Sequence, residues 1–168
     1  MVGKRVLDLG CNQGYWSLAA IESGCDYVLG IDGRQMHVDQ ANFVFDVKKI
    51  SKERFKFCCG DIFDLLDLDL GKFDIILCLG VNISKHMTLF ELISALNTDV
   101  LVIDTLISSK KGSLLETAKQ PLNDPLNAVD YELIMIPTRA ALTDMVQQFN
   151  YQVVVLRPSF SDYTGALD

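Results

Sequence analysis

Two features are scarce in this sequence: basic side chains and long apolar runs. It has 15 lysine and arginine residues against 22 aspartate and glutamate residues, a formal net charge of −7. Nucleic-acid binding depends on clustered basic side chains that neutralise phosphates, and no basic stripe is present. No apolar run is long enough to cross a bilayer. We therefore expect neither nucleic acid nor a membrane as a partner of this chain alone.

Disulfide and zinc-site spacings are also missing. The five cysteines lie in or beside apolar runs, at Cys11, Cys25, Cys58, Cys59 and Cys78. They predict reduced thiols, no metal site and, since no apolar leader opens the chain, a cytoplasmic protein. With 168 residues, of which 49% are apolar, the chain predicts a single soluble domain over residues 1–168. Nothing in the sequence predicts an oligomeric state.

A dinucleotide-binding fingerprint is absent as well. The turn after the apolar run 5–9 has Gly10, Asn12 and Tyr15 where G-x-G-x-x-G has its glycines. Asn12 tolerates the left-handed backbone of a tight turn, but its side chain would crowd a pyrophosphate, and Tyr15 would spoil close helix–strand packing. Asp8 adds a carboxylate that suits an ammonium and a sulfonium better than phosphates. The turn therefore predicts S-adenosylmethionine as cofactor.

Alternating periodicities predict the fold. Strand-like runs occur at 5–9, 27–32, 55–59, 73–79 and 100–106, and helical patterns at 17–23, 38–50 and 88–96. This alternation is typical of a doubly wound α/β domain with a mostly parallel sheet. Right-handed crossovers place the loops after the strands along one edge. Four residues should therefore converge there: Asp8, Asp32, Asp61 and Leu79.

Four sequence motifs carry a family resemblance. The run DLGCNQG at residues 8–14 resembles the first motif of class I S-adenosylmethionine-dependent methyltransferases, with Asn12 in place of the commoner glycine. Residues 31–33, 59–62 and 73–81 resemble their second, third and fourth motifs, in the family's order and spacing. The resemblance implies the Rossmann-like methyltransferase fold, S-adenosylmethionine as donor and methyl transfer as the reaction.

The resemblance also implies roles at both ends of the donor. Asp8 would orient the turn or receive the ammonium through a hydrogen-bond network. Asp32, followed by Gly33, would accept the ribose hydroxyls, with a helix N-cap as the alternative role. Asp61 would bond the adenine amino group and Ile62 would pack on the ring. The remaining residues assigned to the methionine end are Gly10, Asn12, Gly14, Cys78 and Leu79.

The acceptor side has weaker signals. His86 follows the fourth motif, where an acceptor would lie, and a histidine can remove a proton near neutral pH. The alternative is a surface histidine that caps the next helix. Tyr15 and Trp16 can stack on an aromatic acceptor or form part of the core or the pocket wall.

The second half of the chain narrows the resemblance. Residues 101–107 and 131–142 resemble the branch that includes the tRNA wobble-uridine carboxymethyltransferase, whose fourth motif continues into a tyrosine that helps read the extra carboxylate of its donor. Residues 80–86 of this chain contain no tyrosine. We therefore expect ordinary methyl transfer to an unidentified small-molecule acceptor. The alternatives are a fragment of a tRNA wobble-uridine (carboxy)methyltransferase and an inactive cofactor-binding subunit.

Residues 107–130 interrupt the alternation and predict an insertion, either a lid or a solvated loop. Ser113 and Glu116 fit a capping box that would start a short helix. Thr138 predicts the N-cap of a later helix, and residues 151–156 predict a strand. The first strand begins almost at Met1, and no last antiparallel strand follows the tail. We therefore expect a fold that is either truncated at both ends or naturally minimal.

Overall fold

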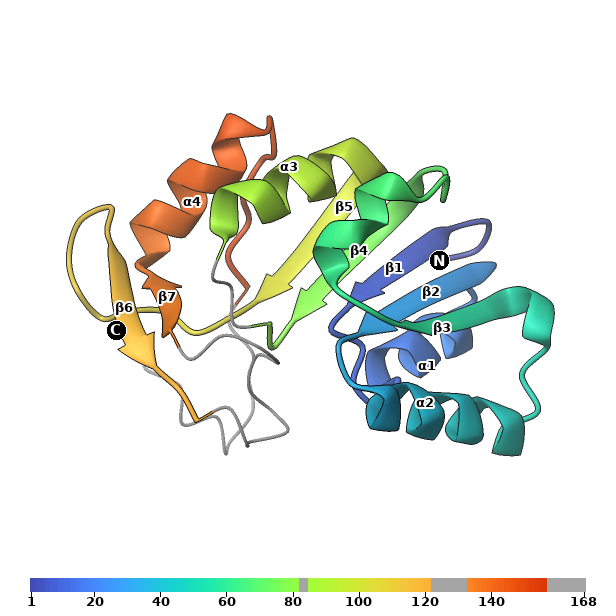
Figure 1. Ribbon diagram of the computed structural model, residues 1–168. Helices are drawn as coiled ribbons and strands as arrows, with labels where there is room; N and C mark the ends of the chain where they lie inside the picture. The colour runs from blue at the N-terminus through green and yellow to red at the C-terminus, as the bar shows by residue number, and fades with distance from the viewer. Residues whose placement is uncertain (82–84, 122–132, 157–168) are drawn as a thin grey trace.

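The computed structural model describes residues 1–81, 85–121 and 133–156. The chain begins with a strand, and helices separate the first five strands from one another. Two further strands then precede the last helix (Figure 1). The strands are β1 (Arg5–Leu9), β2 (Tyr27–Asp32), β3 (Phe55–Cys59), β4 (Phe73–Leu79), β5 (Asn97–Asp104), β6 (Leu115–Lys119) and β7 (Leu133–Pro137). The α-helices are α1 (Tyr15–Glu22), α2 (Gln35–Val47), α3 (His86–Leu96) and α4 (Arg139–Gln148), and the 3-10 helices are η1 (Lys52–Arg54) and η2 (Ile62–Asp67).

The larger sheet has the strand order β3-β2-β1-β4-β5. Each neighbouring pair in it is parallel, with Leu7 opposite both Leu29 and Ile76. The order reverses at β1, which is the switch point where ligands bind in doubly wound sheets. The predicted α/β class is therefore confirmed. The turn after β1, which contains the first motif, lies at this switch point.

Helices cover both faces of this sheet. In Figure 1, α1 and α2 lie on one side of the strands, and α3 and α4 lie on the other. Side chains alternate between two buried clusters because successive strand residues point to opposite faces: Leu7 and Leu9 pack toward α3, whereas Val6 packs toward α1 and α2. Leu142 and Met145 of α4, and Phe149 directly after it, pack on the first cluster, so α4 has an apolar face toward the sheet.

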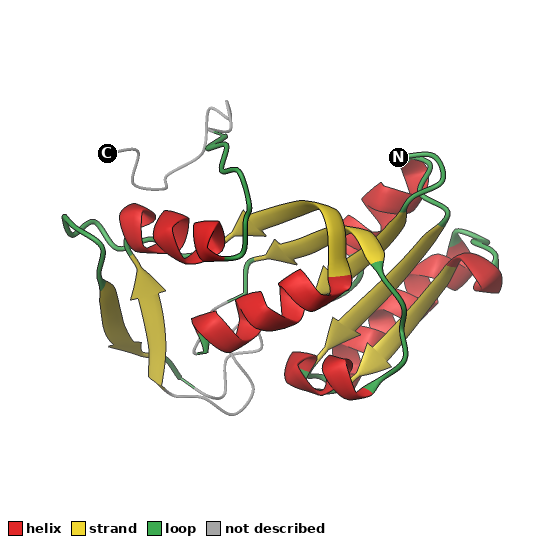
Figure 2. Cartoon of the chain, turned by 90° about the horizontal axis from the view of Figure 1, so that it is seen from above, coloured by secondary structure: helices red, strands yellow, loops and turns green. Residues whose placement is uncertain are grey.

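Residues 107–121 differ from the prediction. The short helix expected from Ser113 and Glu116 is wrong, because β6 occupies that stretch and pairs antiparallel with β7 in a separate two-stranded ribbon (Figure 2). Ser113 Oγ donates instead to Asp144 Oδ2 at 2.6 Å, and Glu116 Oε2 accepts from Ser108 Oγ at 2.7 Å. Long-range pairing therefore overrides a local capping signal. Part of the predicted insertion, residues 122–132, lies outside the described residues.

Two other predictions at the end of the chain have opposite outcomes. Thr138 is the N-cap of α4, and its Oγ1 accepts from the Ala141 backbone N–H at 3.2 Å, as predicted. The strand predicted at 151–156 is wrong, since these residues join no ladder, and Val154 and Leu156 are exposed. Among the described residues, no helix has the length and apolar character that a membrane span requires.

Candidate functional site

The turns that follow the strands are tied together at the carboxyl edge of the larger sheet. The backbone N–H groups of Gly10 and Cys11 both donate to the Ile31 carbonyl at 2.9 Å. The Gly60 N–H donates to the Asp32 carbonyl at 3.0 Å, which links the end of β3 to the end of β2. The first three motifs therefore meet as predicted, on backbone bonds between neighbouring strands.

The first turn has an unusual backbone. Gly10, Asn12 and Gly14 have φ angles of 70°, 48° and 79°, so all three are left-handed. Asn12 thus adopts the left-handed backbone that asparagine tolerates. A Cβ atom on Gly10 would lie 2.9 Å from Val81 Cγ2, so a larger residue would displace the segment after β4. Glycine is required there by both backbone and space.

Asp8 fixes the start of α1 to β1. Its carboxylate is 2% exposed and accepts a hydrogen bond from Ser17 Oγ at 2.6 Å. Burial raises the pKa of Asp8 to about 6, although the bond from Ser17 opposes this shift. Of the two roles considered for Asp8, orientation of the turn agrees with this burial. The sequence analysis did not single out Ser17 as a partner of Asp8; its position in the first turn of α1, nine residues after Asp8, was the available signal.

The raised pKa of Asp8 leads to a pH-dependent stability. Between about pH 4 and 6 the folded state binds a proton that the unfolded state has lost, so this residue's contribution to stability falls as pH rises through that window. We expect Asp8→Asn to gain stability relative to wild type, on the order of 1 kcal/mol more at about pH 8 than at about pH 5. Urea unfolding of both proteins measures this difference. An equal difference at the two pH values would contradict a raised pKa.

Asp32 is the most constrained carboxylate at this edge. It is 8% exposed, and its Oδ2 accepts from the Asn12 backbone N–H at 2.9 Å. Its Oδ1 accepts from the Arg34 N–H at 2.9 Å and lies 3.1 Å from His37 Nδ1. The alternative that Asp32 is a helix N-cap is wrong, because Arg34 has that position in α2. His37 was missed, and no local sequence signal marked it.

The other predicted cofactor residues are placed unevenly. Gly33 is exposed in the turn before α2, and Leu79 is half-buried at the end of β4. Asp61 is exposed and is the N-cap of η2, where its Oδ1 accepts from the Phe63 N–H at 3.0 Å, and Ile62 follows it half-buried. Cys78 is buried in the core cluster that faces α3. Its side chain therefore packs in the interior, and its assignment to the methionine end stays a prediction.

His86 is the first residue of α3, and only Lys85 separates it from the segment 82–84 that follows the fourth motif. The alternative of a surface capping histidine is wrong, because the side chain is 3% exposed and Lys85 has the N-cap position. Neither ring nitrogen has a hydrogen-bond partner among the described residues. Burial lowers the pKa of His86, so the ring is neutral near pH 7.

The aromatic and thiol predictions are resolved in part. Tyr15 and Trp16 are exposed at the start of α1 and pack edge to face at 5.0 Å between ring centroids, so they are not core residues. Burial raises the pKa of Cys11 and Cys78, which keeps these thiols protonated and unreactive. Within the described ranges, no cluster of candidate ligands for a metal ion is found.

Comparison with known proteins identifies the family. A family model described as a methyltransferase domain matches residues 2–128. The chain belongs to this family. The match spans all four motifs and ends in the segment after β6, so it includes the whole carboxyl edge described above. The S-adenosylmethionine-dependent methyltransferase domain predicted from these motifs is thereby confirmed.

Similar proteins include enzymes that act on RNA. A tRNA U34 carboxymethyltransferase of Campylobacter fetus subsp. fetus (strain 82-40) is 29% identical over 153 residues, 89% of this chain and 51% of the relative. A second protein of that name from Pseudomonas fluorescens (strain SBW25) is 28% identical over 109 residues, 62% of this chain and 33% of that protein. The chain thus spans about half of the first relative's length and about a third of the second's. Both relatives have the name of the branch that residues 101–107 and 131–142 resemble.

Solved structures agree with the fold. The N-terminal domain of EvdMO1, crystallised with S-adenosylhomocysteine bound, has a TM-score of 0.67 at 22% identity, covering 87% of this chain and 64% of that one. The [4+2]-cyclase SpnF has a TM-score of 0.60 at 18% identity, covering 88% and 52%. At these identities the likeness concerns the Rossmann-like fold alone.

Proposed function

We propose that this chain binds S-adenosylmethionine at the carboxyl edge of the larger sheet and transfers its methyl group to a small-molecule acceptor. The observation that carries the proposal is the charge of the first turn. Buried Asp8 and Asp32 flank it, and no lysine or arginine occurs between Arg5 and Arg34. Such a turn suits a donor with an ammonium and a sulfonium and disfavours phosphates.

The residues at the edge fit the donor part by part. Asp32 accepts three protein hydrogen bonds, and a carboxylate has about four acceptor positions, so one remains for a ribose hydroxyl. Gly33 leaves this side of the ribose uncrowded. In the proposal, Asp61 accepts from the adenine amino group and Ile62 packs on the ring. Leu79 and the backbone at Cys78 line the methionine end together with Gly10, Asn12 and Gly14.

The reaction asks the protein mainly for alignment. The donor supplies an activated methyl group, so the chain's task is to hold an acceptor in line with it and to exclude water. Positioning of this kind contributes about 7–11 kcal/mol to lowering a barrier. The turn is suited to this task because Ser17 and Asp8 fix α1, and the Asn12 N–H fixes Asp32.

His86 is the proposed base for an acceptor that must lose a proton. Its ring is neutral near pH 7, and neither ring nitrogen has a partner among the described residues, so a nitrogen lone pair is available to the acceptor's proton, although burial disfavours the charged ring. We expect His86→Phe to lower turnover about 100-fold, the lower range for loss of general base catalysis. Its affinity for S-adenosylhomocysteine should stay at the wild-type value, and its stability should not fall, since an unsatisfied polar ring is removed.

Rates and isothermal titrations of the two proteins measure these effects. Unchanged turnover in His86→Phe would show that the reaction does not use this ring. A matched replacement on the same helix, Phe90→Leu, controls for loss of packing because Phe90 is fully buried in the core.

The main alternative acceptor is tRNA. The similarity to the two tRNA U34 carboxymethyltransferases favours it. The excess of acidic residues opposes it for this chain alone, because phosphate contacts dominate nucleic-acid affinity. An inactive cofactor-binding subunit is the third candidate. The proposal includes a single domain over residues 1–168. It also includes a cytoplasmic location, which we infer from the free cysteines.

Transfer of a labelled methyl group separates these candidates. The chain would be incubated with methyl-tritiated S-adenosylmethionine and either a small-metabolite extract or unmodified bulk tRNA. We expect label to enter the small-molecule fraction. Label in tRNA would show that tRNA, and not a small molecule, is the acceptor. Label in neither fraction, with the donor bound, would favour the inactive subunit.

A further inference from the structure

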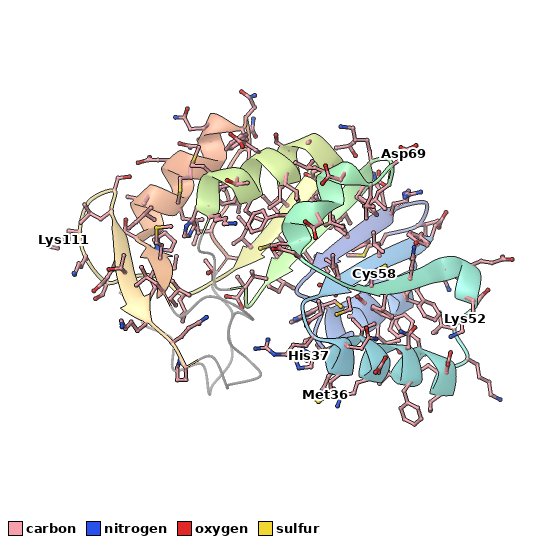
Figure 3. All side chains as sticks on the ribbon, viewed as in Figure 1. Met36, His37, Lys52, Cys58, Asp69 and Lys111 are labelled. Carbon is pink, nitrogen blue, oxygen red and sulfur yellow. The ribbon has the colours of Figure 1, made fainter. Side chains whose placement is uncertain are left out.

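His37 is a buried polar residue outside the sequence motifs. It lies in the first turn of α2, beside the end of β2 (Figure 3). The side chain of His37 is 5% exposed and that of Asp32 is 10% exposed, with 3.1 Å between Nδ1 and Oδ1. A buried ring nitrogen at this distance from a carboxylate oxygen forms a hydrogen bond with it, since leaving Nδ1 of His37 unpaired would be costly.

The direction of this bond follows from the chemistry of the two groups. An ionised carboxylate only accepts, so the proton in the bond must be on Nδ1 of His37. The Oδ1 atom therefore receives two donors, His37 Nδ1 and the Arg34 N–H, while Oδ2 receives the Asn12 N–H. Two of the donors are backbone groups of turns. His37 is the side-chain donor, and it comes from a helix that packs on the sheet.

We propose that His37 is a positioning residue that sets the orientation of the Asp32 carboxylate for the ribose hydroxyls of the donor. The inference rests on the proposed function. With Oδ1 held by His37 and Arg34, the plane of the carboxylate is fixed, and its remaining acceptor position faces the ligand before binding. The affinity gained through the ribose hydroxyls then depends on a residue that touches no ligand atom.

The test compares two ligands in several variants. The ligands are S-adenosylhomocysteine and its analogue without the two ribose hydroxyls, each titrated calorimetrically. His37→Leu removes the donor. His37→Asn keeps an N–H near the place of Nδ1, whereas His37→Gln carries its N–H nearer the place of Nε2. Phe45→Leu, at a fully buried position on the same helix, is the control for a general loss of packing.

We expect His37→Leu to bind S-adenosylhomocysteine about tenfold more weakly, because a displaced Asp32 carboxylate weakens the hydrogen bond from the ribose, which is a bond to a charged group. Its affinity for the analogue should change little, so the preference for the hydroxylated ligand should shrink. His37→Asn should restore that preference and His37→Gln should not, and these two variants decide the matter if His37→Leu does not fold. Phe45→Leu should keep the wild-type preference.

Equal losses for both ligands in His37→Leu, or equal behaviour of the Asn and Gln variants, would overturn the positioning role and leave His37 as a packing residue. Failure of the wild-type chain to bind S-adenosylhomocysteine would overturn the proposed function itself. The two failures are therefore distinguishable in one set of titrations.

Discussion

Replacing Asp32 by alanine is expected to weaken the binding of S-adenosylhomocysteine about 100-fold or more. The change removes the acceptor proposed for the ribose and leaves three donors without their partner, from Asn12, Arg34 and His37. Hydrogen bonds to a charged group are worth about 1.5–3 kcal/mol each, so the loss of affinity should be about 100-fold or more. Isothermal titration of wild type and variant measures it.

Asp26→Ala is the matched control for that variant. Asp26 precedes β2 at the opposite end of the strand, where its Oδ1 accepts from the Gly3 N–H at 2.9 Å. Like Asp32→Ala, the Asp26→Ala variant removes one carboxylate that accepts a backbone hydrogen bond, but it does so at the end of the strand far from the proposed ribose site. Wild-type affinity in Asp32→Ala, or an equal loss in Asp26→Ala, would contradict the role of Asp32.

Gly30→Ala is expected to lower the free energy of unfolding by about 1–3 kcal/mol, the usual effect of overpacking a core. A Cβ atom on Gly30 would lie 2.6 Å from two ring carbons of Phe57 and 3.0 Å from Cys11 Cβ. Phe57 cannot move freely, because it packs edge to face against Phe45 at 4.8 Å. Urea unfolding measures the change, and because Cys11 is in the first turn, ligand affinity should fall as well.

Gly60→Ala provides the comparison. A Cβ there would meet its nearest atom, Ile31 Cδ1, at 3.9 Å, which is ordinary contact. Its stability should stay within about 0.5 kcal/mol of wild type. Equal stabilities of the two glycine variants would show that the space at Gly30 does not limit packing.

The central strands could be predicted from the sequence, because the burial that stabilises these strands also requires the apolar runs that mark them in the sequence. The apolar runs at 5–9 and 27–32 are the strands β1 and β2, since strands buried on both faces need continuous apolar sequence. Right-handed crossovers then bring the turns after these strands to one edge, so Asp32 could be assigned to that edge before its contacts were known.

The failures have physical reasons as well. The helix expected from Ser113 and Glu116 does not form, because β6 pairs with β7, which is a contact between residues far apart in the sequence. The sequence allows His86 to be either a base or a surface residue, because its burial depends on what packs around it in three dimensions. The contact between His37 and Asp32 depends on the angle at which α2 leaves β2, which no motif records.

The most direct test of the account is calorimetric titration of the folded wild-type chain with S-adenosylhomocysteine, with NAD as the comparison ligand. The account predicts saturable binding of S-adenosylhomocysteine at one site per chain and none of NAD, because Asp8 and Asp32 flank the first turn and no lysine or arginine occurs between Arg5 and Arg34 to bind a pyrophosphate. Binding of NAD, or no binding of either ligand by a chain shown to be folded, would contradict it.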